Sequence, residues 1–411
     1  MILISTLRPV KRFICCPLLS FYLLLLFTCP ANSQEGTMSF VSKFAQMRES
    51  KGTERFFWNR VRYEKMIDVG TSCYAEGAYE LIPFWLEDGL RLRDRVSVSS
   101  SESRIYRAVD LQHRISRNTE PSSAEEVVVE HDLDRLFLSC SIGQWELLMG
   151  RQAVSFGAAY SVNPTDLFMP VAFKPQDGEF RSGSDALRIR SRLSDTSELD
   201  FGMLAGFAEN PGNNGAFLRL HMLLGETDLI PVLASFGRNR LAGLSLQSSL
   251  GNWGVVFDGA WVETGEPKTL LPVDQETHWL PWTIGINRQL SAVLFGSLEY
   301  HRNPIGTENP ESYEVHRLQP IYENYPVSLM GQDYLMTSLQ FQISPLWSFS
   351  FSSMHNGNDG SSLILPELDW NLAEDWWINF AGSYSIGKRK RGKSEFGAAS
   401  DLFSLSLRHY R

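Results

Sequence analysis

The residues best suited to a chemical role form a short alternating run. Arg188, Arg190 and Arg192 stand at every second position between mostly apolar residues. Successive side chains of a β-strand point to opposite faces, so the three arginines would share one face. Arg219 lies on a similar alternating segment nearby. A row of cations along a water-filled wall favours anions, although an acidic partner such as Asp200 on the next strand would weaken that effect.

The sequence shows little sign of a catalytic site. The histidines His131, His221, His301 and His355 are scattered, and we find no metal-spaced Cys/His set, no Gly-x-Ser-x-Gly elbow and no phosphate loop. A wall serine paired with His221 or His355 is the remaining hydrolase hypothesis, but serines are too frequent for the pairing to be informative. We therefore expect no enzyme, no metal site and no cofactor.

The elements that must position the arginines are short segments of alternating polarity. Residues 199–207, 216–222, 253–261, 347–352 and 378–385 place apolar side chains at every second position. This period predicts strands rather than helices, and turn-forming runs rich in Asn and Gly separate them. The pattern predicts an all-β fold, a transmembrane antiparallel β-barrel of roughly 16–18 strands. A soluble periplasmic β-sandwich is the alternative, because its strands would alternate too.

The N-terminus has the composition of a secretory signal. Basic residues precede an apolar stretch over 13–29, and a small-x-small site predicts cleavage after Ser33, which makes 1–33 a signal peptide. An uncleaved anchor helix is the alternative, but the stretch is short for a span and contains Pro17. Lipoprotein cleavage at Cys29 is a minor alternative. We expect the mature protein in the outer membrane of a Gram-negative bacterium.

The composition agrees with strands that have one wet face. Hydrophobic residues make up 43% of the chain and the mean hydropathy is -0.17, which excludes a bundle of membrane helices. The net charge of -9 argues against nucleic acid as a partner. Beyond the signal only Cys73 and Cys140 remain, in a compartment that allows disulfides, but the sequence leaves their pairing open.

Beyond the signal the chain reads as an N-terminal arm over 34–54 followed by one β-barrel over 55–411. The arm is polar, and its sequence does not decide between a short helix and an irregular segment. Long inserts at 156–184, 264–277 and 303–332 would form rim loops or fold into the lumen.

Aromatic residues make up 12% of the chain, and we expect them in girdles at the two membrane interfaces. The candidates near predicted strand ends are Trp279, Trp282, Trp347, Trp370, Trp376 and Trp377.

One stretch carries a motif series. Its parts are Asp134-Arg135-Leu136, Gly150-Arg151-Gln152, Phe156-Gly157, Asn163-Pro164-Thr165-Asp166-Leu167-Phe168 and Gly183-Ser184-Asp185-Ala186-Leu187. The series resembles one found in porin-like outer-membrane barrels of Gram-negative bacteria, many of them uncharacterised. The resemblance covers about 134–193 and implies a channel-type barrel rather than a particular solute. The chain departs from the usual aromatic C-terminus of such barrels, since Tyr410 is followed by Arg411.

The loop in the middle of this series can also be interpreted from its own residues. Asn163 before Pro164 is typical of a helix N-cap with proline at the first helical position, and Asp166 would lie in the first turn. This predicts a short helical turn. The loop carrying it would either narrow the lumen or cap one rim.

The candidate site residues are thus open to two interpretations, pore lining or loop anchoring. As anchors, Arg151 and Asp166 would form ion pairs with Arg181 or Asp185 and pin the loop to the wall. The candidate set is Arg151, Asp166, Arg181, Asp185, Arg188, Arg190, Arg192 and Arg219, with the motif residues Gly150, Gln152, Gly157, Asn163 and Pro164.

These patterns favour a porin-like channel for passive or selective diffusion of small polar solutes, with anion preference as a hypothesis. The alternative is a sheath or scaffold that houses a periplasmic electron carrier or an export partner. We expect outer-membrane lipid and small polar solutes as partners. The sequence leaves a homo-oligomer open.

Overall fold

The computed structural model describes residues 36–49, 52–86, 106–108, 113–118, 126–166, 183–206, 214–237, 239–263, 278–318, 322, 329–388, 393–397 and 399–411. The expected signal peptide over 1–33, Arg181 and the insert at 264–277 lie outside these residues.

Antiparallel strands make up most of the described chain. They are β1 (Thr37–Glu49), β2 (Gly52–Val69), β3 (Cys73–Leu86), β4 (His113–Asn118), β5 (Glu126–Ile142), β6 (Trp145–Gln152), β7 (Ser184–Ser194), β8 (Ser197–Leu204), β9 (Gly215–Leu224), β10 (Thr227–Phe236), β11 (Asn239–Leu250), β12 (Trp253–Glu263), β13 (His278–Trp279), β14 (Trp282–Ser291), β15 (Leu294–Arg302), β16 (Asp333–Ser344), β17 (Trp347–Asn356), β18 (Ser362–Ala373), β19 (Trp376–Ile386) and β20 (Asp401–Tyr410). The short helical segments η3 (Pro310–Ser312) and α3 (Tyr313–His316) lie between β15 and β16. Within the described ranges, no helix is long and apolar enough to cross a membrane.

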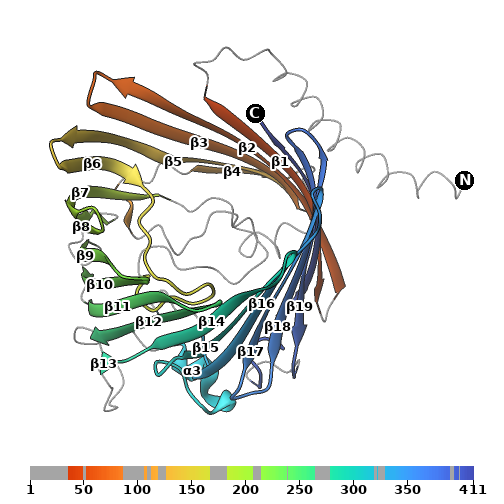
Figure 1. Ribbon diagram of the computed structural model, residues 1–411. Coiled ribbons are helices and arrows are strands. Elements are labelled where there is room, and N and C mark those ends of the chain that lie inside the picture. Colours follow the sequence, from red (N-terminus) through yellow and green to blue (C-terminus); the bar gives the residue numbers. More distant parts are fainter. Residues whose placement is uncertain are drawn as a thin grey trace, which may run out of the picture.

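The strands close into a barrel (Figure 1). Apart from two short pieces, each strand pairs with the next in chain order, and β1 pairs with both β2 and β20. The short pieces share wall positions: β4 pairs with β5 beyond the end of β6, and β13 pairs with β12 beyond the start of β14. The wall therefore has 18 strands, which confirms the predicted fold class at the upper end of the expected range.

The alternation gives each strand an outer and an inner face. On β7, Leu187 is 40% exposed on the outside, whereas Arg188 is 8% exposed and faces the lumen. An apolar outer face suits lipid, and barrel closure lets neighbouring strands satisfy one another's backbone groups at membrane depth. Large exposed apolar side chains recur around this outer face, among them Leu136, Met149, Phe201, Leu218, Ile284, Leu298 and Leu405.

The lengths of the connections distinguish the two rims. The connections after β2, β5, β7, β9, β11, β14, β16 and β18 are short turns. At the opposite ends, those after β3, β6, β8, β12, β15 and β19 are long, although those after β1, β10 and β17 are short. We call these ends the short-turn rim and the long-loop rim. In outer-membrane barrels the short turns are periplasmic. The start of β1 and the end of β20 lie at this short-turn rim.

Aromatic residues border the outer face at both rims. Trp370 stacks on the tryptophan that opens β17, and at the long-loop rim Trp282 packs against Tyr300. Trp279 and Trp377 do not join the girdles: Trp279 packs on an apolar cluster inside the barrel, and Trp377 points inward because it follows an outward-facing residue. Four tryptophans open a strand directly after a short turn: Trp145, Trp253, Trp347 and Trp376.

The segment 34–54, expected as an N-terminal arm, instead contributes a strand to the wall. β1 pairs along its length with β2, and with β20 from Ser39 to Arg48. The segment looks polar because Ser39 and Lys43 lie on the lumen-facing side, where both are buried with Val41. A lumen accepts polar side chains that lipid would reject, so average polarity does not identify a barrel strand.

Cys73 and Cys140 are opposite residues in the β3–β5 register and form a disulfide beside the short-turn rim. The pairing that the sequence left open is therefore present.

We expect the double substitution Cys73→Ser with Cys140→Ser to lower the free energy of unfolding by about 2–4 kcal/mol, because the cross-link restricts the unfolded chain. Urea unfolding of the detergent-folded protein, followed by tryptophan fluorescence without reductant, measures this. Ser141→Ala in the same turn region is the control and should leave the midpoint unchanged. Equal midpoints for the double variant and the parent would contradict the expectation.

Candidate functional site

The described chain that follows β6 enters the lumen. After β6 it crosses the interior of the barrel, as the yellow segment of Figure 1 shows, and reaches the wall at β12 and β15. We call its described part, residues 153–166, the lumen loop. Of the two placements that the sequence allowed, folding into the lumen is the one observed.

Asp258 on β12 anchors the lumen loop. Its carboxylate accepts the backbone N–H of Thr165 at 2.9 Å and the hydroxyl of Thr165 at 2.8 Å. The same carboxylate accepts the N–H of Ala158 at 3.3 Å and the hydroxyl of Ser245, on β11, at 2.5 Å. Asp258 is fully buried, so these donors take the place of water around its charge.

Glu299 on β15 is a second anchor. It accepts the backbone N–H groups of Tyr160 at 2.7 Å and Ser161 at 2.9 Å, and it is also buried. Beside it, the hydroxyl of Thr283 donates to the carbonyl of Val162 at 2.8 Å. Partial burial, with the nearby Glu299 carboxylate, raises the pKa of Tyr160, so its phenol stays neutral to a higher pH than that of a free tyrosine.

A turn, rather than the predicted helix, shapes the tip of the lumen loop. The N–H of Asp166 donates to the carbonyl of Asn163 at 3.0 Å across Pro164, a β-turn pattern. The Asn163 side chain cannot cap a helix because it bonds Ala159 twice, at 2.7 and 2.8 Å. Gly157 has a φ of 100° and packs so closely on Asn163 that a Cβ would clash.

Apolar packing holds the start of the lumen loop against the wall. Phe156 contacts Phe217 of β9 edge to face, with 4.8 Å between ring centroids. The cluster around them also includes Val154 and lumen-facing residues of β7 to β12. Two arginines cover the aromatic pair, with Arg219 over Phe156 and Arg188 over Phe217. The loop is thus fixed by apolar contacts at one end and carboxylates at the other.

Lumen-facing arginines of β7 and β9 form a row next to this packing, which we call the arginine face. Arg188 pairs with Asp200 of β8 at 2.5 Å, and Arg219 shares the same carboxylate at 3.2 Å. Arg190 pairs with Glu146 of β6 at 2.8 Å. The acidic partner considered from the sequence, Asp200, is therefore in contact with two of the arginines.

Exposure differs along the arginine face. The Arg188 side chain is only 10% exposed, while those of Arg219 and Arg190 are 21% and 30% exposed. Arg192 is exposed, towards the short-turn rim. Arg188 therefore holds the wall, and the other three can meet a solute.

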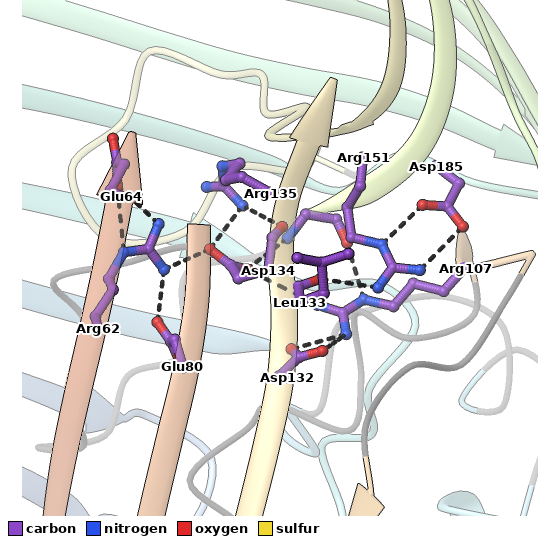
Figure 2. A network of polar contacts seen from close by, with 11 residues as sticks. Arg62, Glu64, Glu80, Arg107, Asp132, Leu133, Asp134, Arg135, Arg151 and Asp185 are labelled. Atoms are coloured by element: carbon purple, nitrogen blue, oxygen red, sulfur yellow. Dashed lines mark hydrogen bonds and ion pairs between the residues drawn. The ribbon is translucent and has the colours of Figure 1, made fainter. Parts of the chain in front are cut away.

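A polar network marks the place where β6 leaves the wall, which we call the seam (Figure 2). β6 pairs only with the last part of β5, and β4 pairs only with its first part, so the backbone around Leu133 lacks a strand partner on that side. Arg151 fills the gap: it donates to the Leu133 carbonyl at 2.9 Å and pairs with Asp185 at 2.7 Å.

Asp134 is the centre of the seam. It lies at a register shift in the β3–β5 pairing, where an extra residue lets neighbouring side chains turn inward together. It accepts the N–H of Gly183 at 3.0 Å and pairs with Arg62 at 2.7 Å. Arg107 pairs with Asp132 at 2.8 Å and donates to the Gly183 carbonyl at 3.0 Å. The buried charges are thus paired within the seam, as they must be away from water.

The structure separates the sequence candidates into three groups. Gly150, Arg151, Gln152 and Asp185 belong to the seam, where Gln152 donates to the Ala186 carbonyl at 3.2 Å. Gly157, Asn163, Pro164 and Asp166 shape the lumen loop, and Arg188, Arg190, Arg192 and Arg219 form the arginine face. Arg151 and Asp185 do meet, but Asp166 lies at the far end of the lumen loop, next to the Thr165 anchor.

The two anchors Asp258 and Glu299 were missed from the sequence. One signal was available for Asp258: it is an acid at an inward position of β12, between small or apolar residues such as Val256 and Ala260. A single buried acid on an otherwise uncharged face needs donors from elsewhere. The spacing of residues along the sequence does not show which distant segment supplies these hydrogen-bond donors.

The loops of the long-loop rim meet at Glu395. Its carboxylate accepts the hydroxyl of Tyr334 at 2.5 Å, the amide of Asn356 at 2.7 Å and the N–H of Met330 at 2.9 Å. Its own N–H donates to Asp359 at 2.6 Å. The contacts join the connections after β15, β17 and β19. Removal from water raises the pKa of Glu395.

This large barrel, with part of its own chain folded into the lumen, belongs by architecture to the class of outer-membrane β-barrels. No family model matches the sequence, and no curated protein matches it. Among solved structures, the fold is similar to Pseudomonas aeruginosa OccK2 (OpdF) in complex with glucuronate, with a TM-score of 0.54, 10% identity, and coverage of 92% of this chain and 97% of that one.

Two further solved structures are similar. Acinetobacter baumannii OccAB1 has a TM-score of 0.53 and 10% identity, covering 92% of this chain and 96% of that one. The outer membrane protein opdK from Pseudomonas aeruginosa has a TM-score of 0.53 and 8% identity, covering 92% and 99%. At such identities the likeness shows the fold.

We expect Asp258→Ala to release the lumen loop, because four donors lose their acceptor and each hydrogen bond to a charged group contributes about 1.5–3 kcal/mol. Chymotrypsin treatment of the detergent-folded protein, with fragments identified by mass spectrometry, should then show cleavage near Tyr160. Glu263→Gln, at the exposed end of the same strand, is the control and should resemble the parent. Equal protection in Asp258→Ala would contradict the anchoring role.

We expect Glu395→Gln to remove part of the pH dependence of stability. Because the folded pKa of Glu395 is raised, the folded state binds this proton more tightly, and stability falls as pH rises above the ordinary glutamate value of about 4.3. Unfolding free energies measured at several pH values report the slope. The exposed Glu308→Gln in the loop after β15 is the control. A slope unchanged by Glu395→Gln would refute the assignment.

Proposed function

We propose that the protein is an outer-membrane channel through which small polar solutes diffuse, with the lumen loop as its constriction. The observation that carries the proposal is a closed barrel, apolar outside and polar inside, whose own loop crosses the lumen and is held at both ends. Barrels of this strand number are wide enough for an aqueous channel. Export through cleavage of residues 1–33 is part of the proposal.

The solved structures support the solute class. The OccK2 structure contains glucuronate, a small polar anion, and its fold is similar to this one over most of both chains. The sheath or scaffold for a periplasmic partner is not favoured, because the lumen loop occupies space that a protein partner would need.

The arginine face supports a modest preference for anions. Its four arginines face three carboxylates, those of Glu146, Glu198 and Asp200. The excess positive charge lies with the exposed Arg192 at the short-turn end. Cations lining a pore attract anions and repel cations, whereas paired arginines contribute less.

Conductance and reversal potentials of the purified protein, measured in a planar bilayer under a KCl gradient, test both the channel and its anion preference. We expect stable conductance steps with chloride preferred over potassium. The double substitution Arg190→Ala with Arg192→Ala should move the reversal potential towards cation preference, because it also leaves Glu146 without its partner.

Arg240→Ala is the matched control. It removes one arginine whose side chain is 77% exposed at the long-loop rim, away from the arginine face, and should leave the reversal potential unchanged. A folded barrel that does not conduct would overturn the channel. Conductance with cation preference in the parent would overturn the anion assignment alone.

A further inference from the structure

An uncharged hollow lies in the wall at the short-turn ends of β14 to β17. Its volume is about 350 Å³, within the ~300–1,000 Å³ range of small-molecule sites. None of the described residues that line it is charged, in contrast to the arginine face and the seam. Its polar lining residues are Gln289, Gln340, Gln342, Ser348 and Ser350, and its aromatic ones are Phe295, Phe341 and Phe349.

Strand alternation places the five polar side chains and Phe295 on the lumen side, whereas Phe341 and Phe349 lie on the outward-facing positions of their strands. Phe295 shares its strand face with Glu299, which holds the lumen loop. Gln340 shares a face with the buried Tyr334 of β16, and Ser350 shares one with the buried Asn356 of β17. The hollow therefore opens towards the water-filled side of the wall rather than towards lipid.

The polar groups of the hollow are partly fixed and partly available. Gln289 and Gln342 donate to turn carbonyls, of Ser291 at 2.7 Å and of Ser344 at 2.6 Å, which orients both amides. Among the described residues, the side chains of Gln340, Ser348 and Ser350 have no hydrogen-bond partner. Amides and hydroxyls both donate and accept, as the hydroxyl groups of a sugar do.

An aromatic pair links the hollow to the constriction. Tyr160 of the lumen loop packs against Phe295, with 5.9 Å between ring centroids. Glu299 accepts a hydrogen bond from the backbone N–H of Tyr160, while the residue as a whole is 46% exposed. A solute that passes the lumen loop towards the short-turn rim would meet this pair beside the hollow. Aromatic faces offer flat apolar area for the C–H surface of a sugar ring.

We propose that this hollow is a binding subsite for uncharged polyhydroxylated solutes, such as neutral sugars. The amide and hydroxyl groups of Gln340, Ser348 and Ser350 exchange hydrogen bonds with the solute, and Phe295 with Tyr160 supplies an apolar face. This proposal rests on the proposed channel function, to which it adds a binding site for uncharged solutes between the lumen loop and the short-turn rim. Binding of a sugar to the hollow can nevertheless be measured without conduction.

Saturation-transfer NMR of glucose with the detergent-folded protein tests the subsite. We expect contact in the parent, and an increase of about tenfold in the dissociation constant for the double substitution Gln340→Ala with Ser350→Ala, as loss of two hydrogen bonds predicts. Gln247→Ala is the matched control, because Gln247 is an exposed glutamine near the same rim on β11, outside the hollow. Phe295→Leu is the second variant and should also weaken contact.

The outcomes separate the two proposals. A parent that conducts KCl but shows no glucose contact overturns the subsite and leaves the channel. A parent that contacts glucose but does not conduct overturns the channel and leaves the subsite. Equal contact in the parent and the double variant, or equal loss in Gln247→Ala, overturns the assignment of the hollow. If the double variant does not fold, undiminished contact in Phe295→Leu overturns it as well.

Discussion

In lipid, a backbone N–H or C=O group must find its partner inside the protein, and this constraint organises the whole molecule. It requires the first strand to pair with the last, so a polar segment becomes β1. It also makes the early end of β6 costly, because β5 would keep unpaired carbonyls at membrane depth. The seam supplies the missing partners: β4 pairs with one part of β5, and the Arg151 side chain donates a hydrogen bond to the Leu133 carbonyl beside it.

The segment that leaves the wall is subject to the same constraint inside the lumen. A loop has backbone donors without strand partners, and buried carboxylates on the far wall accept them. Asp258 and Glu299 therefore serve as loop acceptors, and their charges are not open to solutes. Strand order places the arginine face on β7 and β9 and the uncharged hollow on β14 to β17. The lumen loop reaches the wall at β12 and β15, so its anchors lie away from the arginine face and beside the hollow.

Local patterns predicted the features that depend on one strand at a time. The alternation of 253–261 and 347–352 predicted β12 and β17, and the spacing of Arg188, Arg190 and Arg192 predicted a common face. Predictions that relied on isolated residue preferences were less successful. Asn163 and Pro164 favour a helix start in general, but here the Asn163 side chain is already bonded to Ala159, so the chain forms a turn.

The sequence by itself determined the fold class and the two-faced strands. Alternation with a period of two is a local property, because it places apolar side chains towards lipid and polar side chains towards the lumen within each single strand. The sequence also showed which residues form the motif series. Only the tertiary structure decided their roles: the motif residues of β5, β6 and β7 meet at the seam, and the loop is anchored by acids that lie more than ninety residues further along the chain. Register, strand closure and the far end of a loop depend on contacts between distant segments, and such contacts leave no periodic signal in the sequence.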